Sequence, residues 1–184
     1  MTPSRRAFAV TTIAVLAVDQ GSKAMVEAWL RPGRDEFTLI PGLLSFIHAR
    51  NSAAAFGAFS DVPNRRWIFL ALTIASAPIV AWLVGRLPAT ATRTAAAVGL
   101  MVGGALGNFV DRARTGQVVD FIRVYTDQPA AAAWLRAHVG MDEWPTFNVA
   151  DSALVVGVLL YAALAMFPDD SEDPETDDLG PGMQ

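Results

Sequence analysis

Four long apolar segments dominate the pattern of hydrophobic and polar positions along this chain. They cover residues 7–28, 67–85, 94–112 and 149–167. A helix needs about 20 mostly apolar residues to cross a hydrocarbon layer about 30 Å thick. The pattern therefore predicts a single membrane-embedded domain over residues 1–168. It has four transmembrane helices, and two longer loops, 29–66 and 113–148, emerge on one side of the membrane.

The two longer loops carry patterns that are typical of strands. Residues 37–40 and 43–49 flank Pro41-Gly42, which predicts a strand, a tight turn and a second strand. Residues 117–125 are rich in Val, Ile, Phe and Tyr and favour a third strand. The alanine-rich stretch 129–139 predicts a short surface helix. We therefore expect a small antiparallel β-sheet and a short surface helix beside the four spans.

The third apolar segment contains a stripe of small residues. Gly99, Gly103 and Gly107 recur at every fourth position. Small residues on one helical face let two backbones approach closely in lipid, so the stripe predicts close helix packing. Packing does not explain the polar residues directly beyond the stripe, Asn108 and Asp111, which lie three positions apart on one helical face.

Composition narrows the chemistry that is available to the chain. Hydrophobic residues make up 53% of the sequence, and the mean hydropathy is positive at +0.35. Cysteine is absent, which excludes disulfides, thiol nucleophiles and thiolate metal sites. The two histidines, His48 and His138, are too few for a histidine-rich metal site, so we expect no metal and no cofactor. Because the basic residues are scattered, we expect no nucleic acid partner.

The two ends of the chain differ from the apolar body. Residues 169–184 combine seven acidic residues with Pro and Gly, which predicts a disordered acidic tail. Ser4-Arg5-Arg6 before an apolar run is similar to a twin-arginine export signal. Asp19 and Lys23 interrupt that run and no A-x-A site follows, so we expect an uncleaved first span. The distribution of basic residues does not fix the orientation in the membrane.

Acidic residues near the span boundaries are the best candidates for chemistry, because a carboxylate beside hydrocarbon is costly unless it is paired, protonated or functional. Asp19 has Lys23 at i+4, a spacing at which opposite charges pair on a helix. Asp111 is next to Arg112, and Arg112 or Arg114 is within reach where the helix ends. Local sequence therefore offers both acids a basic partner.

Asp120 and Asp151 lack such a partner in the local sequence. In a strand, Asp120 shares a face with Val118 and Ile122, whereas Arg123 points to the other side. By elimination, Asp120 and Asp151 form the best candidate pair, in which a shared proton lets one carboxyl act as base and the other as acid. Asp151 also suits the first turn of the fourth span, where Asn148 is a natural N-cap.

Two other classes of function remain open on these residues. Ser22-Lys23 is similar to the nucleophile and base of serine–lysine proteases, although neighbouring residues on a helix point in different directions. A small four-span protein is also compatible with a transporter subunit or an assembly factor. Transport favours polar residues near mid-span, whereas here they gather at the helix ends and in the longer loops.

Five motifs, in order, resemble one known family. They are V-D-Q-G-S-K at 18–23, N-S-A-A-A-F-G at 51–57, G-G-A-L-G-N-F-V-D-R at 103–112, V-V-D-F-I at 118–122 and F-N-V-A-D-S at 147–152. Together they resemble lipoprotein signal peptidase, or signal peptidase II, of the bacterial inner membrane, from about residue 7 to 167. Ala53 stands where the family usually has glycine, the stretch 125–146 is longer than usual, and the acidic tail is outside the resemblance.

The resemblance implies a membrane aspartyl endopeptidase with both termini cytoplasmic and its active site near the outer face of the bacterial cytoplasmic membrane. Members of that family remove the signal peptide from prolipoproteins just before a cysteine that carries diacylglycerol, so the implied partners are this substrate and membrane lipid. The chain is expected to act as a monomer. The family's catalytic aspartates fall on Asp120 and Asp151. Its supporting positions fall on Asp19, Lys23, Asn51, Asn108, Asp111, Arg112, Asn148 and Ala150.

Overall fold

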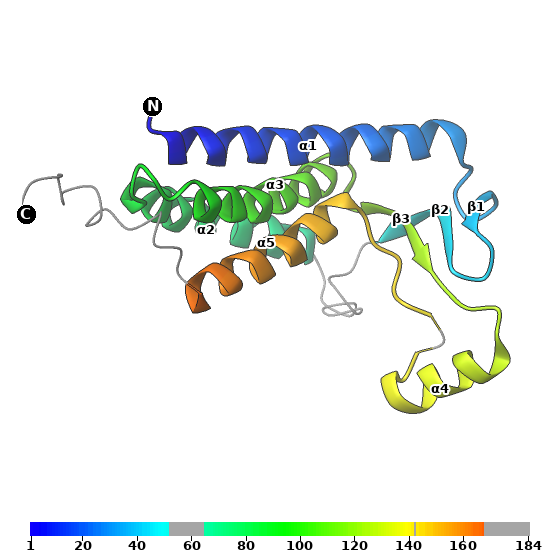
Figure 1. The fold of residues 1–184 in the computed structure, drawn as a ribbon. Helices are drawn as coiled ribbons and strands as arrows, with labels where there is room; N and C mark the ends of the chain where they lie inside the picture. The colour runs from blue at the N-terminus through cyan, green and yellow to red at the C-terminus, as the bar shows by residue number, and fades with distance from the viewer. Residues whose placement is uncertain (52–64, 142, 168–184) are drawn as a thin grey trace, which may run out of the picture. The chain divides into compact units, whose positions relative to one another are not determined.

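The computed structural model describes residues 1–51, 65–141 and 143–167 (Figure 1). Its elements are α1 (Pro3–Trp29), β1 (Glu36–Ile40), β2 (Leu44–Asn51), α2 (Arg65–Arg86), α3 (Thr92–Thr115), β3 (Val118–Val124), α4 (Pro129–Val139) and α5 (Val149–Met166). The predicted acidic tail, and the first-loop motif beyond Asn51 with Ala53, lie outside the described residues.

The chain divides into two compact units. The first unit comprises the described parts of Met1–Ala17, Ala71–Gly107 and Ala150–Gln184, and is entirely helical. The second unit comprises the described parts of Val18–Leu70 and Asn108–Val149, and contains the three strands and α4. The helices α1 and α3 each contribute one end to each unit.

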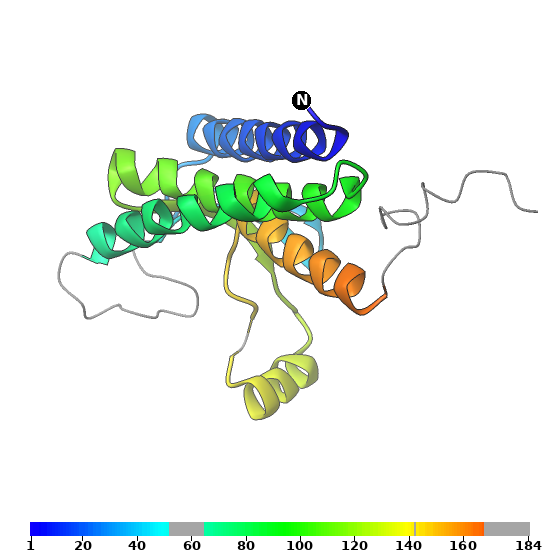
Figure 2. The same ribbon diagram turned by 90° about the vertical axis from the view of Figure 1, so that its left-hand side faces the viewer.

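In the first unit, α1 and α3 pack with their backbones close together (Figures 1 and 2). A Cβ atom added to Gly99 would lie 2.8 Å from the carbonyl oxygen of Phe8, and one added to Gly103 would lie 2.7 Å from Cβ of Val15. The hydroxyl of Thr12 donates to the carbonyl oxygen of Gly99 at 3.3 Å. The predicted packing role of the glycine stripe is therefore confirmed at Gly99 and Gly103.

A second close approach joins α3 to α5. A Cβ atom at Gly104 would overlap the carbonyl oxygen of Ala150, and one at Gly157 would lie 2.9 Å from the carbonyl oxygen of Ala97. Ala150 is fully buried. Adjacent glycines of α3 thus face two different helices: Gly103 faces α1 and Gly104 faces α5.

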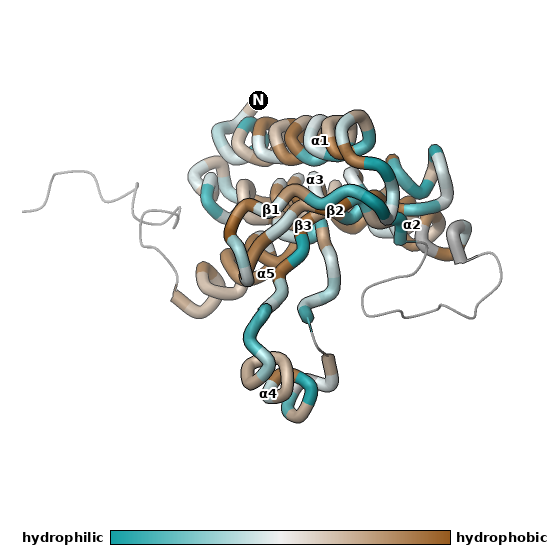
Figure 3. Tube along the Cα trace, turned by 90° about the vertical axis from the view of Figure 1, so that its right-hand side faces the viewer, coloured by the Kyte–Doolittle hydropathy of each residue, from teal (hydrophilic) through white to brown (hydrophobic). Residues whose placement is uncertain are grey.

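The helices of the first unit expose much apolar surface. Within the described residues, α3 and α5 are long and apolar enough to cross a membrane, and the apolar part of α2, Leu70–Arg86, is shorter. Only 17% of the apolar window of α5 is buried, and Val155 and Leu159 are among its exposed side chains. Hydrophobic colouring accordingly runs along α5 in Figure 3. Such a surface suits lipid and not water.

The second unit is built on a three-stranded antiparallel sheet in the order β1-β2-β3. The turn between β1 and β2 is closed by a hydrogen bond from the amide of Leu43 to the carbonyl of Ile40 at 3.1 Å. Pro41 fixes one central position and Gly42, with φ at 70°, takes the positive φ that a type II turn requires at the next. The predicted hairpin and third strand are confirmed.

The predicted surface helix is confirmed as α4. Pro129 occupies its first turn, and Gly140 ends it in the left-handed conformation, with φ at 77°. After α4 the chain returns to β3, where Phe147 pairs with Ile122 through two hydrogen bonds of 2.8 and 3.1 Å. This return places Asn148 beside Asp120.

Candidate active site

Asp120 lies on β3 with its carboxyl group held by two asparagine side chains. The Nδ2 group of Asn148 donates to one carboxyl oxygen at 2.8 Å, and that of Asn51, at the end of β2, donates to the other at 2.9 Å. Asp120 is only 4% exposed. Arg123 is directed elsewhere, since it pairs with Glu143 at 2.7 Å and Glu36 at 3.1 Å. The strand prediction, with Arg123 on the other face, is confirmed.

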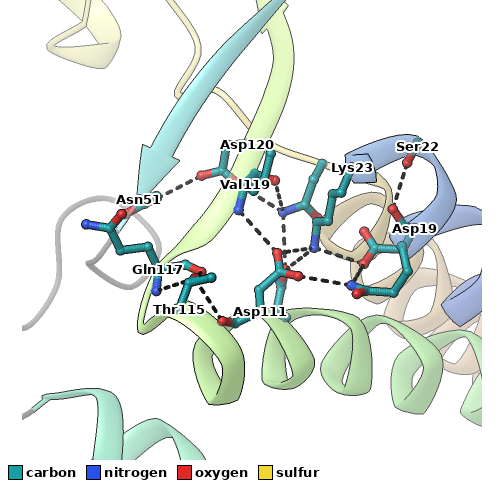
Figure 4. A network of polar contacts seen from close by, with 12 residues as sticks. Asp19, Ser22, Lys23, Asn51, Asp111, Thr115, Gln117, Val119 and Asp120 are labelled. Carbon is teal, nitrogen blue, oxygen red and sulfur yellow. Dashed lines mark hydrogen bonds and ion pairs between the residues drawn. The ribbon is translucent and has the colours of Figure 1, made fainter. Parts of the chain in front are cut away.

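A buried lysine lies in the same unit, between two aspartates. Lys23 Nζ is 2.9 Å from a carboxylate oxygen of Asp19 and 2.9 Å from one of Asp111 (Figure 4). It also donates to the side-chain oxygen of Asn108 at 3.1 Å. The predicted pair between Asp19 and Lys23 is confirmed. For Asp111 the sequence had offered Arg112 or Arg114, and the structure provides Lys23.

Two further donors complete the surroundings of these carboxylates. The side-chain amide of Gln20 donates to Asp19 at 3.1 Å and to Asp111 at 3.0 Å. The backbone N–H of Val119 donates to Asp111 at 3.2 Å, which joins α3 to β3 one residue before Asp120. Buried carboxylates need such donors as well as a cation to offset the loss of water.

The lysine cluster and Asp120 belong to one polar network. The side-chain oxygen of Asn108 accepts from Lys23 and, at 3.2 Å, from Nδ2 of Asn148. The same Nδ2 group reaches the carbonyl oxygen of Val119 at 3.3 Å and Asp120 at 2.8 Å. Seven of the predicted site residues are thereby brought together: Asp19, Lys23, Asn51, Asn108, Asp111, Asp120 and Asn148.

The other three predicted residues occupy different positions. Arg112 follows Asp111 on α3. Ala150 and Asp151 belong to the first unit and lie in the first turn of α5, where Asp151 is half-buried and its charge suits the helix dipole. Gly104 of α3 packs against the backbone of Ala150.

Sequence reasoning missed two parts of this site, Gln20 and the amide of Val119. Gln20 carried a signal, because it follows Asp19 and precedes Lys23 by three positions in an otherwise apolar segment. Val119 contributes its backbone N–H, which the pattern of side chains in the sequence does not indicate.

The geometry does not support the serine–lysine hypothesis. The Ser22 hydroxyl donates to the carbonyl oxygen of Asp19 at 2.9 Å. Lys23 directs its N–H groups to Asp19, Asp111 and Asn108, so it has no lone pair aimed at Ser22. Among residues 1–51, 65–141 and 143–167, no group of three His, Asp or Glu side chains is arranged to hold a metal ion.

Comparison with known proteins identifies the family. A family model described as "Signal peptidase (SPase) II" matches residues 11–167. The chain belongs to the signal peptidase II family. This is a family of aspartic-type peptidases, which fits a site built around a buried aspartate.

Individual members of the signal peptidase II family match over most of their length. A lipoprotein signal peptidase of Geobacter metallireducens is 36% identical over 162 residues, covering 88% of this chain and 91% of the relative. A lipoprotein signal peptidase of Xylella fastidiosa (strain 9a5c) is 32% identical over 178 residues, covering 95% of this chain and 96% of the relative.

Two solved structures share the fold. Both are described as a bacterial membrane enzyme structure by the in meso method, at 1.9 and 2.3 Å resolution. The first has a TM-score of 0.69 at 30% identity and covers 88% of this chain and 93% of its own. The second has a TM-score of 0.70 at 26% identity and covers 96% of this chain and 94% of its own. Together with the apolar helices, they show that this chain is a membrane-embedded enzyme.

Proposed function

We propose that this protein is an aspartic endopeptidase that removes the signal peptide from prolipoproteins, cleaving just before a cysteine that carries diacylglycerol. Membership of the signal peptidase II family supports the reaction class. The observation that carries the chemistry is Asp120, a buried carboxyl group that accepts an amide N–H on each oxygen.

Asp120 and Asp151 act as the catalytic pair in this proposal. The ionised member takes a proton from a water molecule, which attacks the scissile carbonyl carbon. The protonated member donates to the carbonyl oxygen and stabilises the charge that develops there. Two neighbouring carboxyl groups share one proton because two like charges at close range cannot both persist. No metal or organic cofactor takes part.

Other residues hold the substrate. Arg112 and the amide groups of Asn51 and Asn108 bind the extended backbone of the precursor around the cleavage point. The apolar sides of α2, α3 and α5 receive the acyl chains. Support for this arrangement comes from the family motifs at these positions and from the exposed apolar side chains of the helices.

The protein works as a monomer in the bacterial cytoplasmic membrane and crosses it four times, through α1, α2, α3 and α5. Both termini are cytoplasmic, and the sheet and α4 lie at the outer face with the active site. The 27 residues of α1 support its role as a span, since a helix of that length extends for about 40 Å.

The test is cleavage of a synthetic diacylglyceryl precursor by purified protein in detergent. Asp120→Asn and Asp151→Asn should each lower the rate by about 10³-fold or more while the protein stays folded. Asp35→Asn, which removes a partly exposed carboxylate paired with Arg31, is the matched control and should keep the rate. Substantial cleavage by Asp120→Asn or Asp151→Asn would refute the proposed catalytic pair.

The same assay separates the alternative classes. Cleavage without any ion gradient distinguishes a peptidase from a transporter subunit. A precursor whose cysteine carries no lipid should not be cut, which tests the substrate assignment separately. Ser22→Ala should retain most of the activity, and its complete inactivation would revive the serine–lysine hypothesis.

A further inference from the structure

We propose that Asp120 is the ionised, proton-accepting member of the catalytic pair, and that Lys23 fixes this assignment through Asn108 and Asn148. The inference rests on the proposed function, because it assigns roles within the Asp120–Asp151 pair. Asn148 and Lys23 are then positioning residues for the reaction.

The orientation of Asn108 is set by Lys23. An ammonium group has only donors, so the atom of Asn108 that lies 3.1 Å from Lys23 Nζ must be the side-chain oxygen. The two residues are 85 positions apart and both are buried, so the contact is made by the fold and not by local sequence.

The orientation of Asn148 then follows from its own neighbours. Its terminal group lies 3.2 Å from the oxygen of Asn108 and 3.3 Å from the carbonyl oxygen of Val119, and both are acceptors. Only the NH₂ group suits that position, because a flipped amide would place oxygen against two oxygens. Asn148 is fully buried, so water does not relieve such a mismatch.

Asn148 therefore presents a donor to Asp120, 2.8 Å from one carboxyl oxygen. The amide of Asn51 donates to the other oxygen at 2.9 Å. A carboxyl group whose two oxygens both accept N–H groups is stabilised in its charged form, because a proton on either oxygen would face a donor. Both donors are neutral amides. They stabilise the negative charge of the Asp120 carboxylate by hydrogen bonding and do not neutralise it as a cation would.

The resulting cycle balances. Asp120 takes a proton from water as the new C–O bond forms, and Asp151 gives its proton to the carbonyl oxygen. When the tetrahedral intermediate collapses, Asp120 returns its proton to the leaving nitrogen as the C–N bond breaks, and Asp151 recovers one from a hydroxyl of the intermediate. The net reaction adds one water to one peptide bond.

The elements around Asp120 supply several other charged groups. They are Asp19 and Lys23 on α1, Asp111 on α3, Arg50 on β2 with its partner Glu27, and Arg123 on β3 with its partners Glu36 and Glu143. Each of these groups is in an ion pair. Because Asn148 is neutral, replacing it with Leu changes the surroundings of Asp120 but removes none of these charges.

The experiment measures kcat/KM for the lipidated precursor against pH. Asn148→Leu removes the fixed donor and should move the acidic limb of the profile to higher pH by about one to two units, with activity recovering at the alkaline end. Asn148→Ala removes the same donor with a smaller side chain and no added charge, and should move the limb in the same direction. Gln117→Leu is the matched control, because Gln117 contributes only backbone atoms to its bonds with Thr115, and it should leave the limb in place.

Lys23 is tested by the same profile. Lys23→Met should move the acidic limb in the same direction as Asn148→Leu, whereas Lys23→Arg should restore it by returning a cation to Asn108. A merely structural role would change the amount of folded protein and leave the limb unmoved.

The outcomes separate the two proposals. If Asp120→Asn or Asp151→Asn still cleaves, the catalytic pair itself is wrong. If both are inactive and the folded Asn148 variants keep the acidic limb in place or move it to lower pH, the assignment of the charge to Asp120 is overturned and the pair stands. If Asn148→Leu does not fold, Asn148→Ala, which removes the donor without adding a charge, decides.

Discussion

Lys23 of α1 and Asp111 of α3 form a buried ion pair with 2.9 Å between the ammonium nitrogen and the carboxylate oxygen. Lys23 is 3% exposed and contacts a second buried carboxylate, Asp19, at the same distance. Removing one partner from a buried ion pair leaves an uncompensated charge and is more costly than the pair itself is stabilising. The sole lysine of this chain thus holds two carboxylates in place.

Lys23→Met is accordingly expected to destabilise the protein by about 3–5 kcal/mol, because Asp19 and Asp111 would lose their shared cation. Thermal unfolding in detergent, followed by circular dichroism, measures the effect. Arg31→Met removes a cation from an exposed pair just after α1 and should leave the melting temperature nearly unchanged. Equal melting temperatures for the two variants would contradict the structural role of Lys23.

Gly104→Ala tests the close approach of α3 and α5. The added methyl group would overlap the backbone oxygen of Ala150, which cannot move as a side chain can, so we expect a loss of about 1–3 kcal/mol. Gly85→Ala in α2 places its methyl group in open space and should change stability by less than about 1 kcal/mol. The same thermal assay compares them, and a Gly104 variant as stable as the Gly85 variant would refute this packing.

The ion pairs of Arg123 predict how firmly residues 125–146 are held. Arg123 joins β3 to Glu36 on β1 and to Glu143 beyond α4, and the hydrogen bond with Glu143 is the main reason that its pKa is raised. Arg123→Met should make the segment more sensitive to limited proteolysis, and high salt should have a similar effect on the unmodified protein. Arg34→Met, a change at an exposed arginine, should leave the cleavage rate unaltered. Identical digestion of the two variants would contradict the proposal that the ion pairs of Arg123 anchor this segment.

Asp35 should remain ionised to unusually low pH. Hydrogen bonds from the side chain and backbone of Arg31 lower the pKa of Asp35 from 3.8 to about 2. Because the folded-state pKa is depressed, the stabilisation is complete above pH 3.8 and is lost as the pH falls towards 2. A carbon NMR titration of the Asp35 carboxyl should show a midpoint near 2, and in Arg31→Met the midpoint should rise but stay below 3.8, because the backbone hydrogen bond from residue 31 remains. A midpoint near 3.8 in the unmodified protein would exclude the pairing.

The local elements of the fold were predictable because the signals lie within a few residues. Pro41-Gly42 specified the turn of the hairpin. Pro129 marks the start of α4, and Gly140 marks its end. Apolar runs located the helices, although the ends of α1 and α3 extend beyond the predicted spans because helices continue past the apolar region through Arg and Thr residues.

The contacts of the site were less predictable because they are long-range. Local sequence offered Asp111 the neighbouring arginines, but the fold brings Lys23 to it from another helix. Asn148 was predicted as a cap for α5, and the structure shows in addition that its amide donates to Asp120 in a strand, a contact that the local sequence did not indicate. The motif resemblance predicted these residues as a group, whereas their contacts with one another follow only from the tertiary structure.

The central proposal is that Asp120 and Asp151 form one catalytic pair, and a disulfide tests it most directly. The chain contains no cysteine, so the double variant Asp120→Cys/Asp151→Cys carries the only two thiols. A disulfide requires Cα atoms about 4.4–6.8 Å apart, so mild oxidation should link this pair within one chain, as intact mass and gel mobility would show. Asp120→Cys/Ser152→Cys, with the second thiol turned to another helical face, should link far less. Cross-linking of the control pair without cross-linking of the first would contradict the account.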